Sequence, residues 1–223
     1  MRRAVVCFSL LILACDELKT TITVDDPPAP APVKAAAPAA PAVKGPKLRP
    51  VDEWSRDPAL AAYRKQLLDA LRRGDIEAVV ALSDPKIRTD FSEGGSSSDF
   101  PKLLAEKRVR DALATTLSLG GTFLREDAFW TPYVYSKWPE DRDPFGSLVV
   151  IGENVPLRDA AGKTIALLSH DIVDRTAREG QVRTADGKVG RVDPKKLWSP
   201  VGFRAGFNRV GGKWRMNAFV AGD

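Results

Sequence analysis

Cysteine and histidine are nearly missing from this chain. Among its 223 residues the only cysteines are Cys7 and Cys15, and His170 is the single histidine. Residues 16–223 therefore contain no thiol for an internal disulfide, a cysteine-based zinc site or a cysteine nucleophile. Because one histidine does not make a multi-histidine metal site, we expect neither a bound metal nor a cofactor.

Long hydrophobic runs are also absent. The chain has no stretch of about 18 consecutive apolar residues, the minimum for a conventional transmembrane helix. Hydrophobic residues nevertheless make up 43% of the chain and charged residues 28%, which excludes wholesale disorder and permits a buried core. The length fits one domain or two small ones.

The N-terminus has the pattern of an export signal. A basic start at residues 1–3 precedes an apolar run at residues 4–14, which is too short to span a bilayer. The run ends in Ile-Leu-Ala directly before Cys15. This ending resembles the signal of bacterial lipoproteins, which implies a signal peptide over residues 1–14, cleavage before Cys15 and lipid attachment to its sulfur. An ordinary cleaved signal is the alternative.

Proline and alanine dominate the segment that follows. Residues 27–50 hold eight prolines, eight alanines and four basic residues but no acid. Proline fixes φ and removes a donor, so this composition favours an extended spacer over a packed core. We predict that residues 15–50 form a lipidated N-terminus and a tether. A proline-rich ligand for a partner protein is the alternative.

Helical periodicity begins with the next segment. A helix is predicted between the N-cap Asp57 and Gly74, because apolar residues recur there every three or four positions. Asp75 is placed to cap a second, shorter helix, and alternation over residues 87–91 indicates a strand. We therefore predict a mainly helical subdomain over residues 51–148.

Two short segments carry a first family resemblance. Residues 67–75 read LLDALRRGD, and residues 211–220 at the other end read GGKWRMNAFV. Together with residues 82–91, these segments resemble the opening and the final strand pair of nuclear-transport-factor-2-like (SnoaL-like) domains. The resemblance implies a curved sheet around a pocket that binds a small ligand, with or without catalysis. No pocket residue of that family transfers to a position in this chain.

Short β units fill residues 149–198. A Val-Pro-Leu-Arg strand at residues 155–158 is followed by an apolar strand and by a hairpin whose turn is Asp186-Gly187. An Asp-Gly turn of this kind favours positive φ at both central positions. The order resembles the bacterial Src-homology-3-like domain of envelope proteins, which implies a small antiparallel β-barrel with a groove for peptidoglycan.

The sequence departs from that family at two places and then continues beyond it. The family commonly has aromatic residues where this chain has Gln181 and Arg191. A further hairpin, turning at residues 211–212, is predicted to join either the barrel or the sheet of a SnoaL-like domain. We therefore predict an α+β fold, with an N-terminal helical subdomain followed by an SH3-like antiparallel β-barrel and a C-terminal hairpin over residues 149–223.

Charge is distributed unevenly along the chain. Residues 149–223 contain 13 basic and 8 acidic side chains, whereas residues 51–148 contain 14 and 17. In an exported protein a basic region favours anionic wall polymers or phospholipid headgroups over nucleic acid. Simple surface solubility is the alternative. The candidate contact residues are Arg183, Arg191 and Trp198.

Three resemblances to catalytic motifs fail on inspection. Residues 161–164 lack the earlier glycine of a phosphate-binding loop, and Pro85 interrupts the Ser-x-x-Lys spacing of residues 83–86. His170 would act as a catalytic base only beside a nucleophile, and the sequence has no G-x-S-x-G nucleophile elbow. We therefore predict a non-enzymatic lipoprotein of the cell envelope, facing the periplasm or the exterior, that binds peptidoglycan or an envelope protein. The alternative is a SnoaL-like pocket domain for a small ligand.

Overall fold

The computed structural model describes residues 40–90 and 97–222. It has a mixed α+β fold in which the main helices precede most of the strands, so the predicted fold class is confirmed at this level. The predicted signal peptide, Cys15 and the first part of the tether lie outside the described residues. Within the described ranges, no helix has the length and apolar character to cross a membrane.

The helices form at the positions that capping residues mark. Asp57 Oδ1 accepts hydrogen bonds from Ala59 N at 2.8 Å and Leu60 N at 3.2 Å, and Gly74 ends the first helix with φ 68°. Both ends of this predicted helix are thereby confirmed. The α-helices and 3-10 helices of the described residues are η1 (Trp54–Arg56), α1 (Pro58–Arg73), α2 (Ile76–Leu82), η2 (Ser97–Asp99), α3 (Phe100–Ala105), α4 (Lys107–Ser118), α5 (Tyr133–Ser136) and η3 (Pro194–Lys196).

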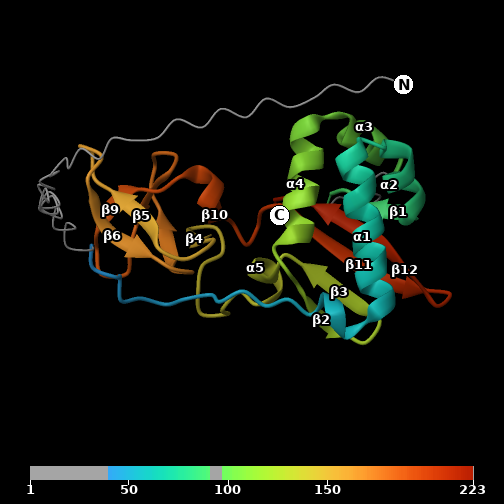
Figure 1. The fold of residues 1–223 in the computed structure, drawn as a ribbon, viewed down its shortest axis with the longest axis horizontal. Helices are drawn as coiled ribbons and strands as arrows, with labels where there is room; N and C mark the ends of the chain where they lie inside the picture. Colours follow the sequence, from blue (N-terminus) through green and yellow to red (C-terminus); the bar gives the residue numbers. More distant parts are fainter. Residues whose placement is uncertain (1–39, 91–96, 223) are drawn as a thin grey trace, which may run out of the picture. The chain divides into compact units, whose positions relative to one another are not determined.

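A five-stranded sheet combines strands from both ends of the chain. Its order is β1-β12-β11-β3-β2, and β1 runs parallel to β12 (Figure 1). Its strands are β1 (Ser83–Arg88), β2 (Thr122–Arg125), β3 (Ala128–Thr131), β11 (Arg204–Val210) and β12 (Lys213–Val220). The C-terminal hairpin β11–β12 is inserted between β1 and β3, so it belongs to this sheet.

Helices α1 to α4 cover one face of the five-stranded sheet (Figure 1). The side chains between the two layers are large and almost fully buried; they include Leu60, Leu67, Leu104, Leu113, Phe129, Phe207 and Met216. Burial of a side chain of this size contributes roughly 1.5–3 kcal/mol. This layer therefore provides the main hydrophobic core.

A second sheet of seven strands has the order β10-β4-β7-β8-β9-β5-β6. Its strands are β4 (Ser147–Val150), β5 (Val155–Arg158), β6 (Thr164–Leu168), β7 (Ile172–Arg175), β8 (Gln181–Arg183), β9 (Val189–Arg191) and β10 (Leu197–Trp198). Its edge strands β10 and β6 do not pair with each other, so the described residues form no closed barrel. Residues from Val150 to Val192 build its separate apolar core.

The end of the predicted tether lies against this second sheet. Backbone hydrogen bonds join Val43 N to Leu167 O at 3.3 Å and Leu48 N to His170 O at 2.8 Å. Val43 and Leu48 are buried, and Lys47 Nζ lies 2.9 Å from the buried carboxylate of Asp171. Residues 41–48 are therefore part of the packed structure, docked along β6 and the turn that follows it.

The hairpin β8–β9 occurs where the sequence predicts it, but its turn is longer. Gly187 has φ 83°, whereas Asp186 does not have positive φ. Thr184 O accepts from Gly187 N at 2.9 Å, and Thr184 N donates to Lys188 O at 2.9 Å. The hairpin loop therefore places only Gly187 in the left-handed region, as in a turn followed by a G1 bulge.

Replacing Gly187 by valine is expected to lower the free energy of unfolding by roughly 1–3 kcal/mol. A Cβ atom on Gly187 would contact nothing within 4 Å, so the cost comes from backbone strain at positive φ alone. Denaturant unfolding of the full-length protein measures this difference. Ala185→Val on the same loop is the control, and equal unfolding curves for the two variants would contradict the assigned turn.

Candidate functional site

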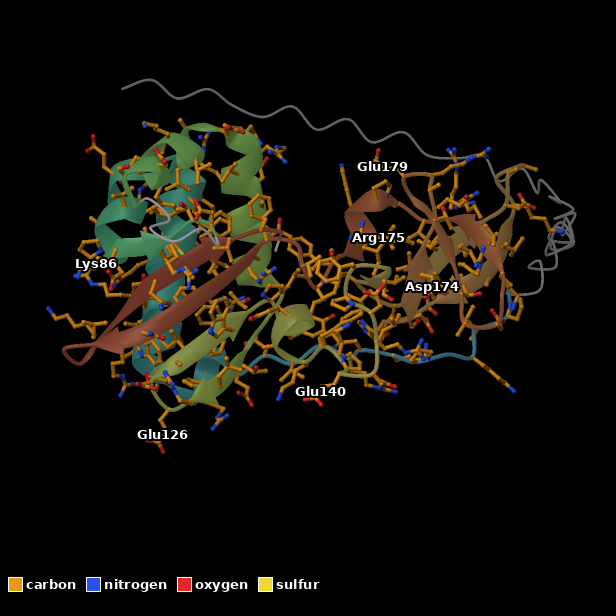
Figure 2. All side chains as sticks on the ribbon, turned by 180° about the vertical axis from the view of Figure 1, so that it is seen from behind. Lys86, Glu126, Glu140, Asp174, Arg175 and Glu179 are labelled. Atoms are coloured by element: carbon orange, nitrogen blue, oxygen red, sulfur yellow. The ribbon has the colours of Figure 1, made fainter. Side chains whose placement is uncertain are left out.

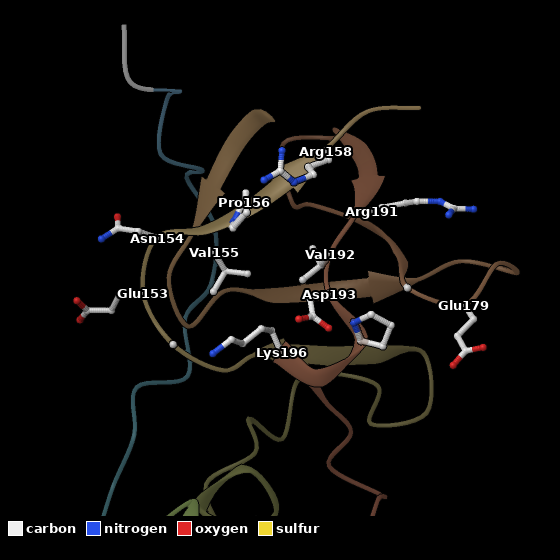
Figure 3. A pocket seen from close by; sticks show the side chains of 13 residues that line it. Glu153, Asn154, Val155, Pro156, Arg158, Glu179, Arg191, Val192, Asp193 and Lys196 are labelled. Atoms are coloured by element: carbon white, nitrogen blue, oxygen red, sulfur yellow. The ribbon is translucent and has the colours of Figure 1, made fainter. Parts of the chain in front are cut away.

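An open cleft of about 660 Å³ lies on the seven-stranded sheet. Its walls come from the loop between β4 and β5, from β5 itself, from the end of the β7–β8 loop, and from β9 and η3. Val155 and Val192 form an apolar floor and belong to the core of this sheet (Figure 3). The cleft thus has an apolar floor, and charged side chains from its walls surround that floor.

Two arginines at paired strand positions border the cleft. Arg158 on β5 and Arg191 on β9 are directly paired in the antiparallel register, and both are exposed. Their guanidinium groups point in opposite directions (Figure 3), so each is open to a negatively charged group of a ligand.

Lys196 and Asp193 lie on the opposite side of the apolar floor (Figure 3). Asp193 Oδ1 accepts a hydrogen bond from Lys195 N at 3.0 Å, so this carboxylate is engaged in capping η3. The side chains of Glu153 and Glu179 point away from the middle of the cleft at its two ends (Figure 3). Arg158 and Lys196 thus border the middle of the cleft together with the engaged carboxylate of Asp193 (Figure 3).

These cations have no ionic partner in the described part of the chain. Within residues 40–90 and 97–222, Arg158, Arg191 and Lys196 form no ion pair at 4.0 Å or less, although Arg158 donates to Gly162 O at 3.0 Å. Guanidinium groups bind carboxylates and phosphates through charge-assisted, often bidentate, hydrogen bonds. The cleft is therefore suited to a ligand with an acidic group.

The cleft wall also contains unusual backbone. Asn154 has φ 54°, and the glycines Gly152 and Gly180 have φ 109° and 69°. Positive φ is ordinary for glycine and uncommon for other residues, so Asn154 is the exception among these three cleft residues.

The structure brings one of the three predicted contact residues into the cleft. Arg191 lines it, whereas Arg183 is exposed on the outer face of β8 and does not. Trp198 lies on β10, which is separated from β8 by β4 and β7, and it packs against Tyr133 and its neighbours. The cleft has no contribution from these last two residues.

Sequence reasoning missed Arg158 and Lys196. Arg158 is the last residue of the Val-Pro-Leu-Arg strand, and alternation along that strand already puts it on the face opposite the buried Leu157. The pairing of Arg158 with Arg191 is a matter of register between two distant strands. No local pattern in the sequence indicates that register.

Side chains fill the interior between the helices and the five-stranded sheet. Aromatic rings occupy this interior: Trp54 lies 4.3 Å from Phe129 and 5.3 Å from Phe207 between ring centroids. Tyr63 Oη donates to Leu82 O at 2.7 Å and accepts from Met216 N at 2.8 Å, and its burial raises its pKa above the ordinary value. These contacts give the interior a structural role.

Across residues 40–90 and 97–222, no group of three or more histidine, cysteine, aspartate or glutamate side chains is arranged to hold a metal ion. His170 lies in the turn between β6 and β7, and its Nδ1 is buried without a hydrogen-bond partner in this part of the chain. Its Nε2 lies 3.9 Å from Glu153 Oε1.

Comparison with known proteins gives similarities in structure only. No family model matches the sequence, and no curated protein matches it. Similar solved structures include an NTF2-like protein with a cystatin-like fold from Novosphingobium aromaticivorans, at 11% identity and a TM-score of 0.29, covering 73% of this chain and 77% of that one. An NTF2-like protein of unknown function from Pseudomonas putida has 10% identity and a TM-score of 0.29, with coverage of 76% and 87%.

A third similar structure is a putative calcium/calmodulin-dependent protein kinase II association domain from Xanthomonas campestris. It has 13% identity and a TM-score of 0.31, and the match covers 78% of this chain and 96% of that one. The first two neighbours belong to the family that residues 67–75 and 211–220 resemble. TM-scores this low carry no argument about function, which is therefore drawn from the cleft itself.

Proposed function

We propose that this protein is a ligand-binding protein of the bacterial cell envelope and that its cleft binds a small or short ligand with an acidic group. The paired, ionically unpartnered arginines Arg158 and Arg191 are the observation that carries this proposal. The apolar floor of Val155 and Val192 would contact the uncharged part of the ligand.

The residues of the cleft favour binding over catalysis. Its described lining contains no serine, threonine, cysteine or histidine, so it offers no hydroxyl, thiol or imidazole for nucleophilic catalysis. The carboxylate of Asp193 already accepts a backbone hydrogen bond at 3.0 Å. Unpartnered cations around an apolar floor serve to hold an anion in place.

The proposed location rests on the N-terminal sequence. The basic start, the short apolar run and Cys15 resemble the signal of a bacterial lipoprotein. A lipid on Cys15 would place the folded part close to a membrane and to the wall polymers beside it. Wall peptides and wall phosphates carry acidic groups of the kind that the cleft is suited to bind.

Replacing Arg158 and Arg191 together by alanine is expected to weaken binding of an acidic peptide about tenfold or more. The probe is the N-acetylated, C-terminally amidated peptide Ala-Ala-Asp, which carries one carboxylate, titrated into the full-length protein at low salt by calorimetry. Binding should weaken as salt rises, because ions screen exposed charges. Lys163→Ala/Arg183→Ala removes the same charge from the same sheet outside the cleft.

Two results would overturn the proposed function. The first is a wild-type protein that does not bind the acidic peptide any better than its neutral analogue, in which Asn replaces Asp. The second is an equal loss of affinity in the control pair Lys163→Ala/Arg183→Ala. Unchanged thermal unfolding of both double variants would establish that the comparison concerns binding alone.

Replacing Cys15 by serine is expected to abolish lipid attachment and processing before residue 15. The reason is that serine has no thiol to accept the lipid. Metabolic labelling with a radioactive fatty acid, followed by membrane fractionation, measures both effects. Cys7→Ser is the matched control within the signal. An acylated, membrane-bound Cys15→Ser protein would show that the anchor is not attached there.

A further inference from the structure

A second, smaller hollow of about 280 Å³ adjoins the cleft. The two hollows share Glu179, Gly180 and Pro194 in their linings, so they meet along the β7–β8 loop and the start of η3. A ligand of modest length seated in the cleft would reach the second hollow by crossing these three residues.

Arg175 occupies an unusual position beside this hollow. It pairs directly with the fully buried Val182, and it lies two residues after the buried Val173 on β7. Side chains at paired positions and at alternate positions share one face of a sheet. Arg175 therefore stands on the core-facing side of β7 at the end of the strand, where the apolar core gives way to the hollow.

Donors outnumber acceptors in the second hollow. Arg175 and Arg178 line it, and neither forms an ion pair at 4.0 Å or less with any described residue; Arg175 is labelled in Figure 2. Ser199 also lines it, and its Oγ is buried without a hydrogen-bond partner in the described chain. Glu179, also labelled in Figure 2, is the one carboxylate of the lining.

A bound hydrogen-bond acceptor would satisfy these donor groups of the second hollow. A buried hydroxyl without a partner costs free energy, and two guanidinium groups near one another favour a shared anion. Gln181 Oε1 accepts from Thr176 Oγ1 at 3.1 Å, which leaves the amide nitrogen of Gln181 as a further donor. The hollow is thus chemically matched to a carboxylate or a phosphate.

We infer that the ligand of the cleft carries a second acidic group, which binds in the hollow formed by Arg175, Arg178 and Ser199. This inference rests on the proposed function and specifies its ligand as a dianion. One acidic group binds on the cleft side that Arg158 and Arg191 border, and the other binds beyond Gly180. Single acids bind either position, and dianions of suitable length bind both.

Peptides with one or two acidic residues test this inference on the full-length protein. The probes are N-acetylated, C-terminally amidated Asp-(Ala)n-Asp peptides with one to three alanines, each with a partner in which one Asp is Asn. We expect at least one dianionic peptide to bind about fivefold or more tightly than its monoanionic partner. Arg175→Ala/Arg178→Ala should remove that gain and leave monoanion affinity within about twofold.

The outcomes separate this inference from the proposed function. If Arg158→Ala/Arg191→Ala abolishes acidic-peptide binding while Arg175→Ala/Arg178→Ala behaves like the control Lys163→Ala/Arg183→Ala, the cleft stands and the dianion inference is wrong. If no acidic peptide binds the wild type, the proposed function itself fails. Peptides with phosphoserine in place of one Asp identify the second group, because a larger Arg175-dependent gain assigns a phosphate and a smaller gain assigns a carboxylate.

Discussion

Replacing Asp57 by alanine is expected to lower the free energy of unfolding by about 2–4 kcal/mol. Asp57 caps α1 through Ala59 N and Leu60 N, which accounts for about 1 kcal/mol. Its Oδ2 also accepts from Trp214 Nε1 at 3.0 Å and pairs with Arg209. Because Trp214 is buried, loss of the carboxylate leaves an indole N–H without an acceptor.

Asp57→Asn is the matched control for this prediction. Asparagine is as good an N-cap as aspartate, so this variant should retain the bonds from Ala59 N and Leu60 N. Its NH2 group replaces Oδ2, so it loses the charge that faces Arg209 and the acceptor for Trp214 Nε1. We expect its loss in stability to be smaller than that of Asp57→Ala by the contribution of the cap, about 1 kcal/mol. Equal stability of the wild type and Asp57→Ala in urea unfolding would show that α1 and the C-terminal hairpin are not joined through this residue.

The pH dependence of stability follows from the same carboxylate. Partial burial opposes its ionisation, but hydrogen bonds from Leu60, Trp214 and Ala59 and the charge of Arg209 hold the pKa of Asp57 below its ordinary value. A lowered folded-state pKa stabilises the protein above the unfolded-state value of about 3.9 and ceases to do so as the pH falls through the folded-state value. The difference between the wild type and Asp57→Asn should therefore shrink below about pH 4.

Replacing Gly190 by valine is expected to lower the free energy of unfolding by about 3 kcal/mol. A Cβ atom on Gly190 would lie 2.7 Å from Arg158 O and 2.9 Å from Leu157 Cγ. One of these is backbone, so β9 and β5 must move apart. The same movement separates Arg191 from Arg158, and binding of an acidic peptide should weaken together with stability.

Thermal unfolding and calorimetric titration of the same samples measure both effects. Gly190→Ala should give a smaller loss than Gly190→Val, because overpacking grows with side-chain volume. Val189→Thr, on the exposed neighbouring position of β9, is the control and should change little. A Gly190→Val protein with wild-type stability and affinity would mean that β9 and β5 do not approach each other as closely as described.

Local signals in the sequence predicted individual helices and strands, whereas the pairing of the strands is known only from the structure. The limits of α1 followed from Asp57 and Gly74, and the hairpin at residues 204–220 followed from alternation around a Gly-Gly turn. The strand expected at residues 87–91 begins earlier, at Ser83. Its parallel partner β12 lies more than a hundred residues away, and no local pattern encodes such a pairing.

The candidate site shows the same division between local and distant information. Charge composition pointed to the C-terminal part, and Arg191 does line the cleft. Trp198 was chosen because it is aromatic, but its ring packs among apolar neighbours, as large aromatics in small domains usually do. The face of the sheet on which Arg183 lies depends on register and twist. Its exclusion from the cleft was therefore not predictable.

Residues 41–48 determine how a mechanical load on the N-terminal side would enter the protein. Leu167 is bonded on both sides, by Val43 N and to Pro41 O, and Ile172 N donates to Pro46 O at 2.9 Å. Because Ala42 bridges Leu167 in parallel, a pull along this segment would load these bonds together. Among the described strands β6 pairs with β5 alone, the strand that carries Arg158. Tension on the proposed anchor and occupancy of the cleft would thus both act on the β5–β6 pair.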